Sequence, residues 1–129
     1  MSPMKTRFPP HVAMAIDECK ALYIRAGAEH RFIFVWVVLV EDRVMIRSWS
    51  GSAKGWAGAF LKERTGTIRL SKDAADIPVR AARVTGKKLL DAMDVAYGEK
   101  YTTKANKKYV SGFATAKRRA MTIELLPND

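Results

Sequence analysis

The fold is decided by residues 32–49, FIFVWVVLVEDRVMIRSW. The first nine of these residues are apolar, and most are β-branched or aromatic, which favours a β-strand. Nine residues are too few to span a membrane, and both alternating faces are apolar, so we expect a strand buried on both sides. Glu41, Asp42 and Arg43 predict a turn, and residues 44–49 return as a second strand. The stretch is therefore predicted to form a β-hairpin.

The returning strand leads into a glycine-containing loop. Alternation divides its side chains into two groups, Val44, Ile46 and Ser48 on one face and Met45, Arg47 and Trp49 on the other. The loop, residues 50–55 (SGSAKG), precedes a predicted helix that begins at Trp56. Backbone amides at the start of that helix, with Arg47, Ser48 and Lys54 beside them, would suit a phosphate group. The simpler alternative is that Lys54 is a solvated loop lysine.

Two catalytic readings of this region are rejected. A nucleotide-hydrolysing P-loop needs a lysine after its last glycine and then serine or threonine, whereas Lys54 precedes Gly55 and Trp56 follows. A nucleophilic serine or cysteine needs a histidine oriented by a carboxylate, and the only adjacent pair is Glu29-His30 on a predicted turn. We therefore assign no catalytic residue.

The sequence around this hairpin predicts a further strand and two helices. Helical spacing of apolar residues indicates a short amphipathic helix at about residues 11–20, within an N-terminal extension, residues 1–20. Residues 22–25 are read as a first strand, joined by a turn to the long apolar strand. The helix that begins at Trp56 would end near residue 65, with Gly66 as the residue that terminates it.

The C-terminal half predicts a second hairpin, a long helix and a last strand. Residues 67–71 and 77–84 alternate as two strands joined by a turn. A helix with Thr85 as its N-cap follows, and its buried stripe consists of Leu89, Leu90, Met93, Tyr97 and Tyr101. Residues 102–119 show no strong period and are predicted to be a loop. Residues 120–126 form the last strand, which gives about six strands and three helices in all.

Composition limits the class of protein. The 129 residues are 48% hydrophobic, which suits one compact domain, residues 1–129. The formal charge of +10 favours anionic partners, either phosphate-bearing small molecules or nucleic acid. We expect no metal site, because one cysteine and two histidines give no zinc-ligand spacing. No secretory signal is evident, so a cytoplasmic protein without membrane contact is expected.

Aromatic and basic residues suggest two kinds of ligand surface. Trp36 is predicted to lie in the core. Trp49 and Trp56 could frame a flat aromatic ligand, although packing between a strand and a helix is the more common use of tryptophan. The tract from Lys104 to Arg119 holds six Lys/Arg and is preceded and interrupted by tyrosines, as on surfaces that bind single-stranded nucleic acid. A solvated loop would have the same composition.

Residues 22–127 resemble the six-stranded split-barrel superfamily, which contains the pyridoxamine phosphate oxidase-like flavoproteins and the deazaflavin-dependent nitroreductases. Within it, the chain is most similar to an uncharacterised bacterial family of small proteins. The resemblance lies in the order and spacing of these segments: His30-Arg31, residues 35–38, residues 44–49, Gly55-Trp56, residues 77–81, Ala96-Tyr97, Lys100-Tyr101 and residues 122–127.

The resemblance implies a fold, a cofactor and a set of site residues. The fold would be α+β and mainly β, a six-stranded antiparallel split barrel with about three packed helices. The ligand would be a flavin-type or deazaflavin-type cofactor, FMN or a deazaflavin. Carried over position by position, the residues that contact the cofactor are Arg31, Ser48, Lys54 and Trp56, to which the strand pattern adds Arg47. Many such barrels are homodimers, so a homodimer is expected.

Two hypotheses of function follow. The preferred one is a protein that binds a flavin or deazaflavin through its phosphate and could support a reductase, with the cofactor supplying the hydride chemistry. The alternative is a non-catalytic anion or nucleic-acid binding module that uses the same barrel and the basic tract from Lys104 to Arg119. The basic composition supports both hypotheses, and nucleic acid is the less favoured partner.

Overall fold

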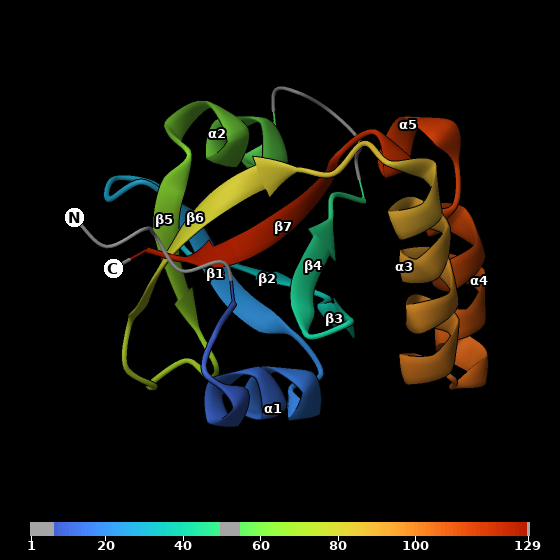
Figure 1. The fold of residues 1–129 in the computed structure, drawn as a ribbon, viewed down its shortest axis with the longest axis horizontal. Helices are drawn as coiled ribbons and strands as arrows, with labels where there is room; N and C mark the ends of the chain where they lie inside the picture. Colours follow the sequence, from blue (N-terminus) through green and yellow to red (C-terminus); the bar gives the residue numbers. More distant parts are fainter. Residues whose placement is uncertain (1–6, 50–54, 129) are drawn as a thin grey trace.

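The computed structural model describes residues 7–49 and 55–128 (Figure 1). Within these ranges it has five helices and seven strands. In chain order they are α1 (Pro10–Glu18), β1 (Leu22–Ala26), β2 (Ile33–Val35), β3 (Val38–Val40), β4 (Arg43–Arg47), α2 (Trp56–Glu63), β5 (Thr65–Arg69), β6 (Ile77–Arg83), α3 (Lys87–Lys100), α4 (Lys104–Phe113), α5 (Ala116–Arg119) and β7 (Thr122–Pro127). The predicted α+β class is confirmed, with five helices in place of about three.

All strands belong to one antiparallel sheet with the order β2-β1-β5-β6-β7-β4-β3. Its two edge strands, β2 and β3, are neighbours along the chain, because only Trp36 and Val37 separate them. Three residue steps span at most about 11 Å, so the sheet must curl until its edges approach each other. This curled, split-barrel-like sheet is the predicted architecture.

The predicted nine-residue strand is therefore two short strands joined by a bend. Its first part pairs with β1, where Ile33 lies opposite Ile24, and its second part pairs with β4, where Val38 lies opposite Met45. A straight strand could not pair with both ends of the sheet, so the chain bends at Trp36 and Val37. Counted as one bent strand, it gives the six strands that the sequence predicts.

The hairpin of β3 and β4 is confirmed. Val40 pairs with Arg43, which leaves a two-residue turn at Glu41 and Asp42. Both turn residues have positive φ, 52° and 64°, as the primed turns that suit the twist of a hairpin require. The turn fixes the register and so fixes which face of β4 each side chain occupies.

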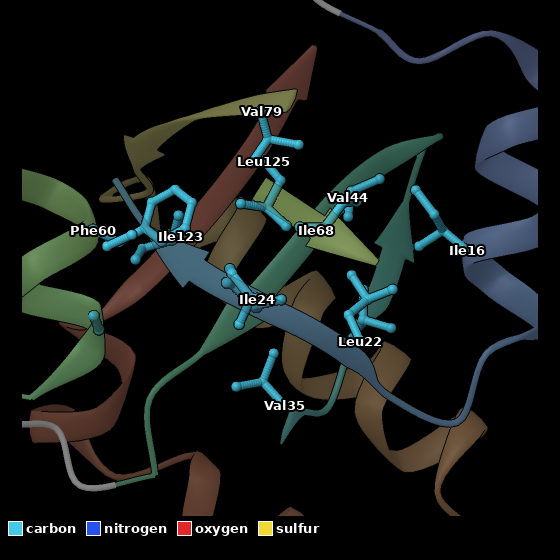
Figure 2. Packing of buried hydrophobic residues seen from close by; sticks show 14 of the residues in the cluster. Ile16, Leu22, Ile24, Val35, Val44, Phe60, Ile68, Val79, Ile123 and Leu125 are labelled. Atoms are coloured by element: carbon cyan, nitrogen blue, oxygen red, sulfur yellow. The ribbon is translucent and has the colours of Figure 1, made fainter. Parts of the chain in front are cut away.

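The interior of the curled sheet is packed with aliphatic side chains, shown in Figure 2. Leu22, Ile24, Ile68 and Ile123 are each at most 1% exposed. Helix α2 contributes Phe60, which is fully buried against them. The alternation read from the strands thus predicts the inward side chains of the sheet correctly.

Gly66 is not the terminator of α2, contrary to the prediction. Arg64, in the left-handed conformation with φ 67°, is the C-cap, and Gly66 lies within β5. A Cβ on Gly66 would lie 2.2 Å from the carbonyl oxygen of Arg25 and 2.9 Å from the Phe60 ring. The glycine is needed because strand β1 and helix α2 both approach β5 closely there.

The C-terminal helices cover the sheet beside β3 and β4 (Figure 1). The predicted buried stripe of α3 is confirmed at Met93, Tyr97 and Tyr101. Thr85 is not its N-cap, because Gly86 occupies that position. Nothing among the described helices is long and apolar enough to cross a membrane.

The loop predicted at residues 102–119 is wrong, because helices α4 and α5 occupy most of it. The Thr103 hydroxyl accepts a hydrogen bond from the Asn106 backbone N–H, which satisfies one free donor at the start of α4. Val110 and Phe113 then pack against the buried side chains of α3. This tertiary packing stabilises α4. The sequence alone does not indicate the helix, because it is rich in lysine and contains Gly112.

Candidate functional site

Where α4 meets the sheet, a pocket of about 330 Å³ opens, which we call the aromatic pocket. Its walls come from β2, the bend after it, β4, α2 and α4. The lining residues are Phe34, Val35, Trp36, Arg47, Trp49, Trp56, Asn106, Tyr109 and Phe113. Most of them are aromatic, with one amide and one guanidinium among them, which is the mixture typical of sites for small planar ligands.

Trp36 forms a fixed wall of this pocket and is not the core residue that we predicted. It is only partly buried, and its ring stacks on Tyr101 with 4.0 Å between centroids and 5° between planes. The Tyr101 hydroxyl accepts a hydrogen bond from the Val37 N–H at 3.1 Å and donates to the Lys20 carbonyl. Burial raises the pKa of Tyr101 to about 12, so the hydroxyl stays protonated in these contacts.

Trp49 forms the opposite, more open wall, with 40% of the residue exposed. Its ring meets the edges of Tyr109 and Phe113, each with a centroid distance of 5.3 Å. The Arg118 guanidinium lies 3.7 Å over the same ring, and its Nε donates to the Trp49 carbonyl. A Cβ on Gly112 would lie 2.5 Å from Cη2 of Trp49, so only glycine leaves room for the ring.

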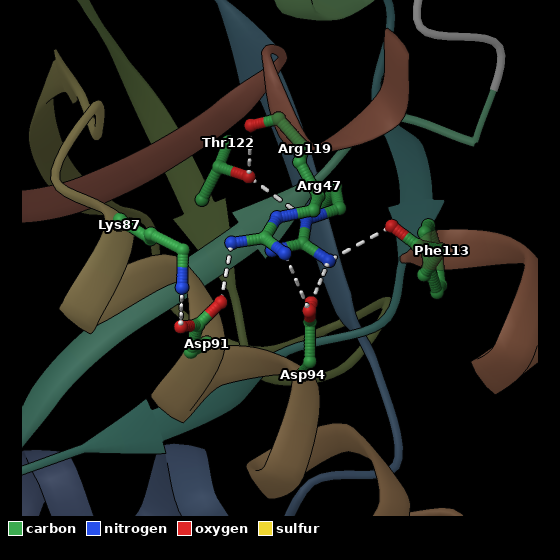
Figure 3. A network of polar contacts seen from close by, with 7 residues as sticks. All are labelled: Arg47, Lys87, Asp91, Asp94, Phe113, Arg119 and Thr122. Atoms are coloured by element: carbon green, nitrogen blue, oxygen red, sulfur yellow. Dashed lines mark hydrogen bonds and ion pairs between the residues drawn. The ribbon is translucent and has the colours of Figure 1, made fainter. Parts of the chain in front are cut away.

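Arg47 belongs to a buried charge network, shown in Figure 3. Its side chain is fully buried, with Nε donating to the Thr122 hydroxyl at 2.8 Å and Nη1 donating to Asp94 at 2.5 Å. Nη1 also donates to the carbonyl of Phe113 at 2.9 Å, which ties the end of α4 to β4. Arg47 therefore holds the wall of the pocket in place, and its Nη2 makes no hydrogen bond to the described residues.

The network continues to the surface of α3. Arg119 contacts Asp94 at 3.3 Å and Asp91 at 2.7 Å, and Lys87 contacts Asp91 at 3.0 Å. Hydrogen bonds from Lys87 and then from Arg119 lower the pKa of Asp91. The two aspartates therefore connect α3 to α5 and β4.

A second pocket, of about 230 Å³, lies between β1, the turn that follows it and α2. We call it the basic pocket, because Arg25, His30 and Arg31 line it and none of the described residues adds a carboxylate to its lining. The N-cap of α2 is Gly55, which has no side chain to cap the first amides of the helix. Nε of Arg25 is buried and has no hydrogen-bond partner among the described residues.

Trp56 lines both pockets, which therefore lie next to each other. Of the predicted site residues, the structure places Arg31 in the basic pocket and Arg47 in the aromatic pocket. Ser48 is fully buried next to Arg47 and lines neither pocket. Lys54 lies outside the described residues, so its predicted convergence with Arg31 and Ser48 stays a prediction.

Sequence reasoning missed Arg25 and the whole contribution of α4. The alternation of β1, which turns Leu22, Ile24 and Ala26 inward, could have marked Arg25 as a residue at the sheet surface. Asn106, Tyr109 and Phe113 recur at helical spacing and could have indicated one face of a helix. Nothing local in the sequence brings that face to Trp49, which lies more than 50 positions earlier.

The basic tract from Lys104 to Arg119 is divided by the fold. Arg118 and Arg119 are only partly exposed and are engaged with Trp49 and with the aspartates of α3. The remaining lysines of the tract, Lys104, Lys107, Lys108 and Lys117, are exposed on α4 and α5. The tract therefore offers fewer cations to an external ligand than its sequence indicates.

Comparison with solved structures and protein families identifies relatives of the chain. The crystal structure of the conserved hypothetical protein Rv2991 from Mycobacterium tuberculosis is similar, with a TM-score of 0.56 and 13% identity. The match covers 97% of this chain and 82% of that chain, and it shows a shared fold. Comparison with curated proteins found no match. The family model described as "Uncharacterized protein conserved in bacteria (DUF2255)" matches residues 14–125, and the chain therefore belongs to this bacterial family.

Proposed function

We propose that the protein binds a flavin-type or deazaflavin-type cofactor across the aromatic and basic pockets. The observation that carries the proposal is the position of Trp56, which lines a pocket of rings on one side and a pocket of cations on the other. Flavins and deazaflavins combine a planar ring system with a phosphate. A ligand of that kind could place its ring in one pocket and its phosphate in the other.

In the aromatic pocket, the ring system would pack against Trp49, Trp56 and Tyr109. Offset stacking and edge contacts between such rings contribute about 0.5–1.5 kcal/mol each beyond burial. The Asn106 amide, which has both a donor and an acceptor, can pair with the carbonyl and imide groups of the ring. The stacked pair Trp36 and Tyr101 keeps the rear wall rigid, which lowers the entropy lost on binding.

In the basic pocket, the phosphate would meet Arg25 and Arg31. A guanidinium offers two parallel N–H donors to phosphate oxygens, and Arg25 has a buried donor without a partner among the described residues. The amides at the start of α2, to which Gly55 at the N-cap offers no side chain, add partial positive charge on the same side. Ser48 and Lys54 remain predicted contributors from the sequence.

The bound cofactor would supply the hydride chemistry, and a reductase is the activity that this arrangement supports. The residues of the chain would position the ring and exclude water from one of its faces. Phe34, 62% exposed at the rim of the aromatic pocket, leaves the other side open for a substrate or a second subunit. The homodimer expected from the resemblance is tested by the mass of the protein in solution.

The test is a titration of FMN, a deazaflavin and riboflavin into the purified protein, followed by quenching of tryptophan fluorescence. Riboflavin lacks the phosphate, so comparing its affinity with that of FMN separates the contribution of the aromatic pocket from that of the basic pocket. Trp56→Ala should weaken all three ligands more than tenfold, a loss of about 1.4 kcal/mol or more, whereas Trp56→Phe should keep most of the affinity. Arg31→Gln should weaken the binding of FMN and leave the affinity for riboflavin unchanged.

The matched control is Arg64→Gln, which also removes an exposed arginine, at the other end of α2. It should leave FMN affinity unchanged. The proposal fails if wild-type protein binds none of the three ligands at millimolar concentration. The assignment of the phosphate fails separately if Arg31→Gln weakens FMN and riboflavin equally.

A further inference from the structure

A second surface, on the outside of the sheet, also carries rings and cations. The inward positions of β1 are Leu22, Ile24 and Ala26, so Tyr23 and Arg25 point outward. In the pairing with β2 and β5, Tyr23 lies opposite Phe34 on one side and Arg69 on the other. We call the outward residues of these three strands and their neighbours the outer sheet face: Tyr23, Arg25, Phe32, Phe34, Thr67, Arg69 and Lys72. Each of these residues is partly or largely exposed.

The rings and cations of this face contact one another. The Arg69 guanidinium lies 4.2 Å over the Phe32 ring, and the Arg25 guanidinium lies 4.8 Å from the same centroid. Tyr23 packs against Phe34 with 4.9 Å between centroids. Arg25, Phe32 and Arg69 thus form one cluster of planar side chains, and Tyr23 and Phe34 form a second cluster. The pairing of β1 with β2 and β5 places the two clusters on the same face.

A shallow hollow of about 450 Å³ opens between these groups. Tyr23, Phe32, Arg69 and Lys72 line it, so two rings and two cations surround the same space. The one carboxylate that the described contacts place beside it is Asp76, which pairs with Arg69 at the surface. None of the four lining residues belongs to the aromatic or the basic pocket.

Rings and cations that alternate on an open sheet fit a polymer that alternates flat bases with phosphates. Bases stack on aromatic rings and on guanidinium planes, while the backbone follows the positive charges. An acidic peptide would satisfy the cations but would leave the rings without a flat partner. We propose that the outer sheet face binds single-stranded nucleic acid, with a base stacked in the Phe32 and Tyr23 hollow and phosphates at Arg69 and Lys72.

This surface is a better nucleic-acid site than the tract from Lys104 to Arg119, to which the sequence points. On that tract, Arg119 pairs with two carboxylates and Arg118 lies over the Trp49 ring, whereas Arg69 pairs with one exposed carboxylate, Asp76. The outer sheet face keeps rings and cations together on neighbouring strands. The net charge of +10 is compatible with either location, so the choice rests on the contacts of the rings and cations on each surface.

The experiment measures binding of a fluorescein-labelled oligothymidylate of about 15 nucleotides, a length within the usual site sizes, by anisotropy over a series of salt concentrations. Phe32→Leu keeps apolar volume and removes the ring, and it should weaken binding about tenfold. Phe32→Tyr restores a ring and should bind within about twofold of wild type. Arg69→Gln should reduce the slope of log K against log salt by about 0.7, the value for one phosphate contact on a single strand.

Lys117→Gln is the matched control, because it removes an exposed cation from the α4 and α5 tract. It should leave affinity nearly unchanged. The proposal is overturned if wild type does not bind at low ionic strength, if Lys117→Gln weakens binding as much as Arg69→Gln, or if Phe32→Leu binds like wild type. Thermal unfolding of each variant checks its fold, and FMN titration of the same variants separates this site from the cofactor pockets.

Discussion

The two buried regions of the molecule are built from different side chains. The interior of the curled sheet is a cluster of aliphatic residues with Phe60 from α2. The layer between the sheet and α3 and α4 adds a group of aromatic rings, Tyr97, Tyr101 and Phe113, to its other apolar side chains, and beside it lies the fully buried Arg47. Aliphatic burial is non-directional, whereas aromatic and charged groups need particular partners. The sheet should therefore tolerate small changes of shape, and the helical layer should depend on single contacts.

The strongest test of this difference is Asp94→Ala. The substitution leaves the Arg47 guanidinium buried without its only carboxylate among the described contacts, and we expect a loss of about 4 kcal/mol in the free energy of unfolding. Urea unfolding measures it. Asp91→Ala is the control, because Asp91 contacts only the more exposed end of the network and should cost much less. Equal losses for the two variants would show that Arg47 does not depend on Asp94.

In the sheet interior, Ile24→Ala should cost about 3 kcal/mol, because it opens a cavity among residues that are fully buried. Ile24→Val removes one methyl group and should cost only about 1 kcal/mol. Both losses should be the same at pH 5 and pH 8, since no titrating group is involved. If Ile24→Val lowered the free energy of unfolding as much as Ile24→Ala, the sheet interior would be as sensitive to changes of shape as the layer between the sheet and α3 and α4.

Gly112→Ala tests the contact between α4 and Trp49. An added Cβ would lie 2.5 Å from Cη2 of Trp49, so the ring must move, at a cost of about 2 kcal/mol, and tryptophan emission should shift to longer wavelength. Gly98→Ala is the matched control in α3, where an added Cβ would meet only Cγ1 of Val110 at 4.0 Å. That variant should be neutral or slightly stabilised. The steric argument fails if the two variants behave alike.

The smallest expected effect is a dependence of stability on alkaline pH. Because the pKa of Tyr101 rises from 10.0 to about 12 on folding, the folded protein holds this proton more tightly than the unfolded chain. The stabilisation is complete below pH 10 and is lost as the pH rises toward 12, by about 1 kcal/mol or less once solvent is considered. Tyr101→Phe should flatten part of this decline, measured as the change in Tm between pH 9 and pH 11. A decline of equal slope in both proteins would exclude Tyr101 as a contributor.

The sequence predicts the sheet well because its strands are apolar or alternating segments separated by turn residues. It does not show the bend at Trp36 and Val37, since the apolar run continues through that point without a change of pattern. It also does not indicate α4, because the lysines and Gly112 of this segment are typical of a loop. The helix is stabilised by the packing of Val110 and Phe113 against α3. Tertiary contacts decide both features, and no local window contains them.

The candidate site likewise contains residues that the sequence indicates and residues that only tertiary contacts bring together. The family resemblance points to Arg31 and Trp56, and both line a pocket in the structure. Three other residues of the aromatic pocket come from α4, and Asp94, which pairs with Arg47, lies 47 positions further along the chain. Pairing across such distances follows from the closure of the sheet and not from any motif.

The position of β7 has a consequence for how the protein is made. This strand, Thr122–Pro127, follows all the others along the chain, yet it lies in the middle of the sheet between β6 and β4. During synthesis the ribosome delivers β4 and β6 first, and each must wait with an unpaired edge until β7 emerges. Unpaired strand edges are where nascent chains aggregate, so the interval before residue 122 is the one in which a chaperone would matter most.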